Sequence, residues 1–196
     1  MQHTALDRLP SLARTRAERA LLTDAVARLD ERHDLVRKVA REPELEAILE
    51  EFIGRLQRGF GSLSSVRGKR ILDIASGSNS SRSPTTGKRT ALFEPWFARL
   101  ALELGAEPVA LDAGDLKGER FEHHRVDLGR TGALDFLADA SFDGVQDSRL
   151  FGSPEFREAY PRRRDHERVT AEIARQERRV LRPDGVVIHT DNPPRP

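Results

Sequence analysis

The centre of the fold is indicated by Arg70-Ile71-Leu72-Asp73-Ile74-Ala75-Ser76-Gly77-Ser78-Asn79-Ser80. This stretch begins as a short apolar run with one acid inside it and ends in small residues. Short apolar runs of this kind are typical of strands buried in a parallel sheet. Small residues at the end of a strand let a ligand approach the backbone, because no bulky side chain blocks it. We therefore predict a buried strand whose carboxyl end contacts a bound small molecule.

Further apolar runs follow, and helical segments lie between them. The runs are 108–112, 121–126, 142–146 and 185–189, and the helical segments are about 95–104, 132–139 and 168–181. Alternating strands and helices are typical of a parallel sheet with helices on both faces. The pattern predicts an α/β fold with a doubly wound, mostly parallel, Rossmann-like sheet of about five strands.

The residues before Gly68 have the periodicity of helices instead. One segment carries apolar residues at the spacing that lines one helix face, namely Leu45, Ile48, Leu49, Phe52, Ile53 and Leu56. An earlier helix is predicted from about Ser11, a plausible N-cap, to about Leu29. We therefore predict an N-terminal helical cap over residues 1–68, lying over the strand ends, and a sheet domain over residues 69–196.

The composition of the 196 residues argues against several classes of protein. Lys and Arg total 33 against 32 Asp and Glu, and the signs are interleaved, so no basic face is expected for a nucleic-acid partner. No apolar run approaches the roughly 20 residues that span a bilayer, so no membrane partner is expected. The chain has no cysteine, which fits a reducing compartment. Its first residues lack the layout of an export signal, and we predict a cytoplasmic protein.

Polar residues stand at the end of each predicted strand, where doubly wound sheets bind their ligands. Asp112 could accept two hydrogen bonds from a ribose diol. Asp127 could accept from an exocyclic amine, and Leu128 could pack on a flat base. The fourth run ends in Gln146-Asp147 and the fifth in His189. We expect these groups to converge on one edge of the sheet.

Two further expectations concern buried acids and metals. Asp73 lies inside an apolar run, where an unpaired carboxylate is costly, so backbone or loop donors are expected to hold it and to shape the loop. His123 and His124 are adjacent in a predicted strand and face opposite sides, so they cannot share one metal ion. No metal site is predicted.

Taken together, five segments resemble the successive motifs of class I S-adenosylmethionine-dependent methyltransferases, in the order of that family. They are ILDIASGSNS (71–80), PVALDAG (108–114), HHRVDLG (123–129), SFDGVQDS (141–148) and VLRPDGVVIHT (180–190). The phrase 181–185 is similar to the turn that enters the family's fifth strand. The resemblance implies S-adenosylmethionine as the cofactor and a small-molecule methyl acceptor as the partner.

The resemblance also implies roles for individual residues. Asp112 would hold the ribose of the cofactor, and Asp127 with Leu128 would meet its adenine. Gln146 with Asp147 would border the methyl-transfer site. The amino-acid part of the cofactor would be held by the loop after the first strand, through Asp73, Ala75, Ser76, Gly77, Ser78 and Asn79.

A general base is needed when the acceptor atom is oxygen or nitrogen, because a proton must leave it. By position alone, Asp147 and His189 are the candidate catalytic residues. Tyr160 is expected to serve packing, with a place in the substrate pocket as the alternative.

The sequence departs from the family in three places. Its loop has Gly77 alone, with Ala75 and Asn79 where the family has further glycines, although Asn tolerates positive φ and would let the loop turn. Residues 80–93 are an insertion, either a lid or substrate loop or a floppy surface loop. No sequence remains for the family's final strand pair, so the fifth strand would be an exposed edge. We predict a homodimer or N-terminal helices packed over that side, and strands from another chain are a further alternative.

The sequence also bears on other kinds of function. The loop lacks the G-x-G-x-x-G pattern of nicotinamide-binding folds, and Gly77 and Gly87-Lys88 lack the spacing of a phosphate loop. A non-catalytic or regulatory methyltransferase-like module is an alternative, because fold alone does not establish chemistry. Another is an enzyme that uses the same cofactor without methyl transfer, as in ring closure on its aminobutyryl chain.

Overall fold

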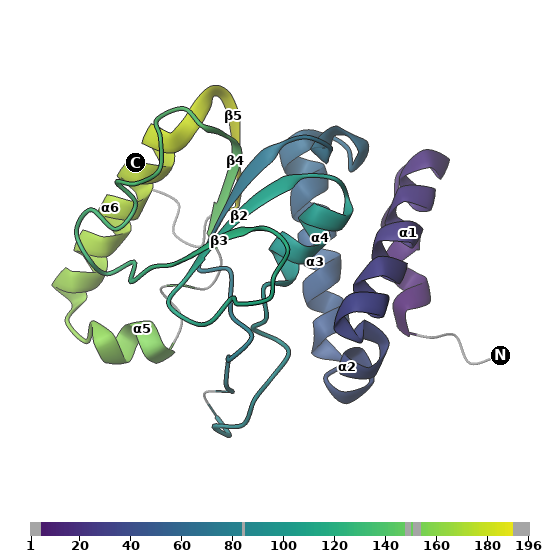
Figure 1. Cartoon of the computed structure of the whole chain (residues 1–196), viewed down its shortest axis with the longest axis horizontal. Helices are drawn as coiled ribbons and strands as arrows, with labels where there is room; N and C mark the ends of the chain where they lie inside the picture. The colour runs from purple at the N-terminus through teal and green to yellow at the C-terminus, as the bar shows by residue number, and fades with distance from the viewer. Residues whose placement is uncertain (1–4, 84, 148–149, 151–153, 190–196) are drawn as a thin grey trace.

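The computed structural model describes residues 5–83, 85–147, 150 and 154–189 (Figure 1). Its strands are β1 (Arg70–Ile74), β2 (Glu107–Asp112), β3 (Glu122–Arg125), β4 (Phe142–Asp147) and β5 (Leu181–His189). They form one five-stranded sheet in the order β3-β2-β1-β4-β5, and every neighbouring pair is parallel. This is the strand order of Rossmann-like α/β folds, so the predicted fold class is confirmed.

The described helices begin before the sheet and continue between its strands. They are η1 (Ala5–Leu12), α1 (Arg16–His33), α2 (Leu35–Arg41), α3 (Glu44–Phe60), η2 (Ser64–Val66), α4 (Trp96–Glu103), α5 (Pro154–Ala159) and α6 (Arg163–Val180). Ser11 lies within η1, so its prediction as the N-cap of the first long helix is wrong. Thr15 is the cap, because its hydroxyl accepts from the amide of Glu18 at 3.1 Å.

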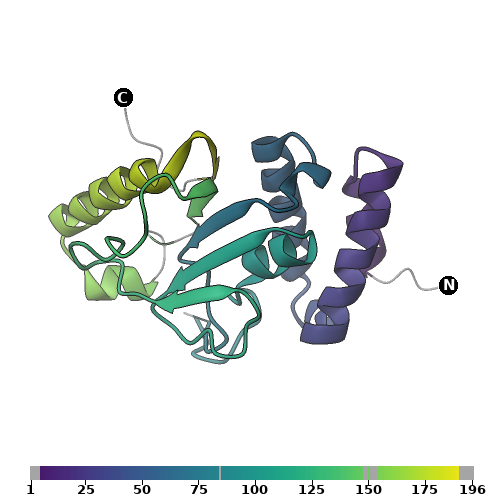
Figure 2. The same cartoon turned by 45° about the horizontal axis from the view of Figure 1, so that its top comes forward.

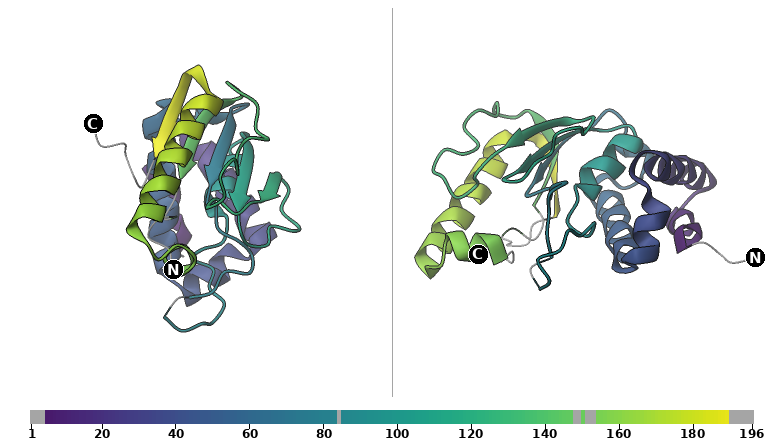
Figure 3. Two further views of the ribbon diagram at one scale, coloured as in Figure 1. Left: turned by 90° about the vertical axis from the view of Figure 1, so that its left-hand side faces the viewer. Right: turned by 60° about the horizontal axis from the view of Figure 1, so that its bottom comes forward.

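One face of the sheet is covered by α3 and α4, with α1 packed outside them (Figure 3). Leu56 of α3, Trp96 of α4, Ile71 of β1 and Ile188 of β5 belong to one buried apolar cluster. The N-terminal helices therefore pack on a face of the sheet, and the prediction of a cap over the strand ends is wrong. The reason is that the apolar stripe of α3 is long enough to need the sheet as its partner.

The opposite face is covered by α6, so the sheet is enclosed on both sides (Figure 2). Val169 and Ile173 of α6 share an apolar cluster with Leu72 of β1 and Val145 of β4. Side chains alternate along a strand, so neighbouring residues of β1 face different helical layers. The alternation therefore determines which helix covers each polar residue of β1 and β4.

The predicted helix over 132–139 is wrong, because the structure has a series of turns there. Gly132 and Ala140 have left-handed backbone angles, with φ of 73° and 48°. The guanidinium of Arg179 donates to the carbonyls of Leu134 and Leu137 at 2.9 and 2.7 Å. These bonds from α6 satisfy carbonyls that a helix would have used internally.

The predicted turn over 181–185 is also wrong. α6 begins at Arg163 and passes directly into β5, which starts at Leu181. The pairing of β4 with β5 contains register shifts between Phe142 and Gly144, which accommodate the extra residues.

β5 is an edge strand of the sheet and has only β4 as a neighbour among the described strands. α3 packs against β5, with Gly59 next to Ile188, which agrees with the predicted helices on that side. Val187 is still 52% exposed. The homodimer remains a prediction. None of the helices in the described part of the chain is long and apolar enough to span a membrane.

Candidate functional site

The parallel register brings the predicted strand-end residues to one edge of the sheet. Ile74, the last residue of β1, lies opposite Leu111 on one side and Asp147 on the other. Asp112 follows Leu111 and lies opposite Arg125. Asp127 comes two residues after β3 ends. The edge therefore carries acids after three strands, with the loop after β1 between them.

The loop after β1, residues 75–79, is named the cofactor loop after its predicted role. Its turn is made by Ala75 and Gly77, which have φ of 57° and 86°. Positive φ falls on Ala75 and not on Asn79, so the expectation that Asn79 supplies the turn is wrong. A Cβ on Gly77 would lie 2.1 Å from the carbonyl oxygen of Phe93. Only glycine therefore fits at position 77 without moving the backbone opposite.

The serines of the cofactor loop hold its shape. The amide of Ser76 donates to the carbonyl of Leu111 at 3.1 Å, and its hydroxyl donates to the carbonyl of Gly77. Ser78 is buried, and its amide donates to the carbonyl of Phe93 at 2.9 Å. The loop is thus tied to β2 on one side and to the segment before α4 on the other.

Asp112 joins two loops at the end of β2. Its Oδ2 accepts from the amide of Gly77 at 3.0 Å, and its Oδ1 accepts from the amide of Gly114 at 2.7 Å. The prediction placed Asp112 beside the cofactor loop, and the structure brings the two together. A ligand hydroxyl at this carboxylate would add to these bonds or replace them.

Asp73 lies below this edge and is fully buried. Its Oδ1 accepts from the side-chain amide of Gln146 at 2.8 Å, and Arg55 of α3 donates to the Oε1 of Gln146 at 3.5 Å. Backbone or loop donors are expected for Asp73. The backbone of Ala98 in α4 supplies one bond, but the bond at 2.8 Å comes from a side chain of the neighbouring strand. Burial raises the pKa of Asp73 to about 7, although the bonds from Gln146 and Ala98 act to lower it. Asp73 and Gln146 support the strand ends from beneath.

Asp147 ends β4 and is buried. Glu177 of α6 is also buried, and its Oε1 has no hydrogen-bond partner in the described part of the chain. Burial, together with the charge of Asp147, raises the pKa of Glu177 to about 8. The backbone of His189 ends β5, but its side chain lies outside the described residues, as do Ser148 and Thr190.

Asp127 is held by a residue whose polar role the sequence did not reveal. Its Oδ1 accepts from the hydroxyl of Tyr160 at 2.9 Å and from the amide of Gly129 at 3.0 Å. A Cβ on Gly129 would lie 1.8 Å from the ring of Tyr160, so a larger residue there would displace the tyrosine from Asp127. Leu128 is buried in the core cluster beneath α6. The structure thus places Asp127, but not Leu128, at the surface of the edge.

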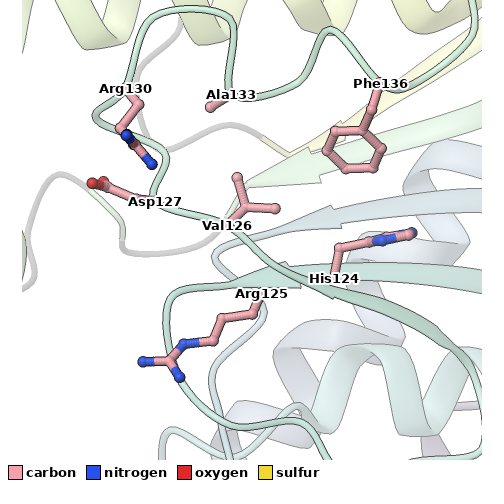
Figure 4. A pocket seen from close by; sticks show the side chains of 7 residues that line it. All are labelled: His124, Arg125, Val126, Asp127, Arg130, Ala133 and Phe136. Carbon is pink, nitrogen blue, oxygen red and sulfur yellow. The ribbon is translucent and has the colours of Figure 1, made fainter.

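A cavity of about 370 Å³ opens beside Asp127 (Figure 4). The ring of Phe136, which is 52% exposed, lies 4.8 Å from the ring of His124. The residues that line the cavity come from β3 and the segment after it, namely His124, Arg125, Val126, Asp127, Arg130, Ala133 and Phe136. In Figure 4 Phe136 lies above His124, and Arg130 and Asp127 lie at the other end of the cavity. A flat group could rest on Val126 between these ends.

The insertion over residues 80–93 is anchored at both ends. Arg82 and Arg89 form an antiparallel bridge, which makes the insertion a hairpin. The hydroxyl of Thr90 and the amide of Ala91 donate to the carboxylate of Glu42 at 2.9 and 2.8 Å. The insertion is therefore held against Glu42, and its role as a lid or substrate loop stays a prediction. Pro84 lies outside the described residues.

A scan against models of protein families and a search of curated proteins both find no match to this chain.

Proposed function

We propose that this protein is a methyltransferase that uses S-adenosylmethionine and acts on a small molecule. The observation that carries the proposal is the 3.0 Å bond from the amide of Gly77 to Asp112. It joins a tight turn of small residues to an acid at the carboxyl end of adjacent parallel strands. That combination suits a nucleoside with a charged tail at the point where the strand order reverses.

The polar groups present at this edge suit the cofactor in their chemistry. A Cβ on Gly114 would lie 2.3 Å from the hydroxyl of Ser78, so the loops after β1 and β2 approach each other closely. Asp112 would accept from the ribose hydroxyls, and the cofactor loop would face the amino-acid part. Asp127 would accept from the adenine amine. When bound, the cofactor supplies a methyl group that is already activated by its sulfonium.

The remaining work of the chain is alignment and removal of water. Holding two reactants in a near-attack pose can supply several kcal/mol of the barrier reduction. Asp147, buried at the end of β4, is the candidate to take a proton from the acceptor, and His189 is the alternative. The methyl acceptor and the homodimer belong to the same proposal, as does a cytoplasmic location.

Replacing Asp112 with alanine tests the proposal. We expect the affinity for S-adenosylhomocysteine to fall by about 1–3 kcal/mol, because the ligand loses a partly buried polar partner and the loop loses its anchor. Isothermal titration measures the affinity.

The matched control is Asp115→Ala. Asp115 lies on the same loop but is exposed, and the recorded bond of its carboxylate is to the amide of Lys117. The control should bind like the wild type. No heat of binding to the wild-type protein would exclude the cofactor, and binding without methyl transfer to any acceptor would favour a non-catalytic module.

A further inference from the structure

Arg99 of α4 is buried at the centre of a polar cluster, with its side chain only 4% exposed. Its Nη1 donates to Glu94 at 2.6 Å. Its Nη2 donates to Glu119 and to the side-chain oxygen of Asn79, both at 2.7 Å. One planar guanidinium therefore contacts three segments that are distant in the sequence.

These three segments surround the candidate site. Asn79 ends the cofactor loop, Glu94 follows the insertion, and Glu119 belongs to the loop after β2. Asn79 also donates from its Nδ2 to Glu119 at 2.9 Å and from its backbone amide to the carbonyl of Asp115 at 3.0 Å. Both halves of the Asn79 amide are thus used, one by Arg99 and one by Glu119. The contacts hold the cofactor loop against the loop that carries Asp112.

The cluster is balanced in charge, which explains how it can be buried. Glu94 also accepts a hydrogen bond from the ammonium group of Lys38 in α2 at 2.5 Å. The carboxylates of Glu94 and Glu119 are thus matched by the cations of Arg99 and Lys38. The guanidinium of Arg99 also lies 4.6 Å from the ring centre of Trp96. Burial acts to raise the pKa of Glu119, but the bonds from Arg99 outweigh it and the pKa lies below its usual value. Buried ions are tolerated when they are paired and hydrogen-bonded in this way.

We propose that Arg99 is a positioning residue for the cofactor loop and acts on it through Asn79. By fixing the end of the loop, Arg99 keeps the amide of Gly77 on Asp112. The inference rests on the proposed function, because it assigns the loop to the cofactor. It also predicts that the side chain of Asn79 serves the loop and does not itself contact the cofactor.

A buried ion pair elsewhere on α4 provides the matched control. Glu103 is buried and pairs with Arg28 at 2.7 Å, with Arg32 and, more loosely at 3.7 Å, with Arg120, the residue after Glu119. It lies on the same helix as Arg99 but has no recorded bond to the cofactor loop. Glu103→Gln therefore weakens an ion pair of the same helix without touching the loop.

The first experiment compares Asn79→Ala with Glu103→Gln. Asn79→Ala is used in place of an Arg99 variant, because loss of Arg99 would remove the cation that pairs with buried Glu119, would leave Glu94 with Lys38, and could prevent folding. We expect Asn79→Ala to bind S-adenosylhomocysteine about tenfold more weakly, in line with the loss of two buried hydrogen bonds. Glu103→Gln should bind like the wild type. Equal affinities for the two variants would overturn the inference.

A swap of side chains tests the geometry itself. Asn79→Asp alone places an acid against Glu119 and should weaken binding. Combined with Glu119→Gln, the acid at position 79 still accepts from Arg99, and the new amide at position 119 donates to it. The double variant should therefore recover most of the wild-type affinity. A double variant weaker than both single variants would contradict the proposed arrangement.

Amide hydrogen exchange gives a readout that needs no ligand. In Asn79→Ala, exchange should become faster in residues 76–94 and stay unchanged in α1 and α6. In Glu103→Gln the exchange of 76–94 should match the wild type. Unchanged exchange of this segment in Asn79→Ala would overturn the positioning role. A wild-type protein that does not bind S-adenosylhomocysteine would refute the proposed function, while exchange would still decide the role of Arg99.

Discussion

Replacing Gly77 with alanine is expected to destabilise the protein by more than about 3 kcal/mol and to abolish detectable binding of S-adenosylhomocysteine. The new Cβ would lie 2.1 Å from the carbonyl oxygen of Phe93, in a backbone conformation with φ of 86°. The backbone on one side has to move. Movement of the loop separates the amide of Gly77 from Asp112, and movement of Phe93 breaks its bond with the amide of Ser78. Denaturant unfolding gives the stability, and isothermal titration gives the affinity.

Gly87→Ala is the control that separates the effect of the Gly77 clash from the effect of backbone strain. Gly87 has φ of 66° in the insertion, but a Cβ there would meet nothing within 4 Å. Its replacement should cost only about 1 kcal/mol and leave binding unchanged. If Gly77→Ala behaved like Gly87→Ala in both measurements, the close approach of the cofactor loop to Phe93 would be wrong.

Glu177→Gln is expected to stabilise the protein at alkaline pH, by roughly 2–4 kcal/mol at pH 9. Burial and the charge of Asp147 raise the pKa of Glu177 to about 8, from an ordinary value of 4.5. A raised acid pKa means that the folded protein holds the proton more tightly than the unfolded chain. The contribution of Glu177 is therefore fully present below about pH 4.5 and is lost as the pH rises through 8. Glutamine keeps the neutral form at every pH.

The measurement is the free energy of unfolding of both proteins between pH 5 and pH 9. The difference between them should grow with pH. Glu172→Gln on the same helix is a control in which the change in stability has the opposite sign. Bonds from Arg175 and Gln176 lower the pKa of Glu172 to about 2. It should reduce stability at neutral pH by less than about 1 kcal/mol, since the pair is partly exposed. Parallel pH profiles for wild type and Glu177→Gln would contradict the buried acid.

Most of the sheet could be predicted from the sequence because its central strands, β1, β2 and β4, are largely apolar runs. Residues 70–74, for example, are both the predicted and the observed first strand. The segment 132–139 shows where such patterns fail. Leu134 and Leu137 do face the core, but Arg179, far along the chain, binds the carbonyls that would have closed a helix. Local periodicity carries no information on such a distant donor.

The candidate site could likewise be predicted only in part. Asp112 and the Gly77 turn could be placed together because parallel strands end at a common edge. The partners of the acids could not be predicted, because each comes from another element: Gln146 binds Asp73, and Tyr160 binds Asp127. The lone tyrosine just after α5 gave no sign of which acid it would meet. Arg99 was equally hidden within an apolar helix.

The structure of the protein with S-adenosylhomocysteine tests the proposed site most directly. We predict that the ribose hydroxyls lie within about 2.6–3.2 Å of the carboxylate of Asp112. The homocysteine tail should run along the cofactor loop, and the adenine should lie toward Asp127. The result that would contradict the proposal is an adenosine whose ribose makes no contact to Asp112, with the Gly77 turn making no contact to the ligand.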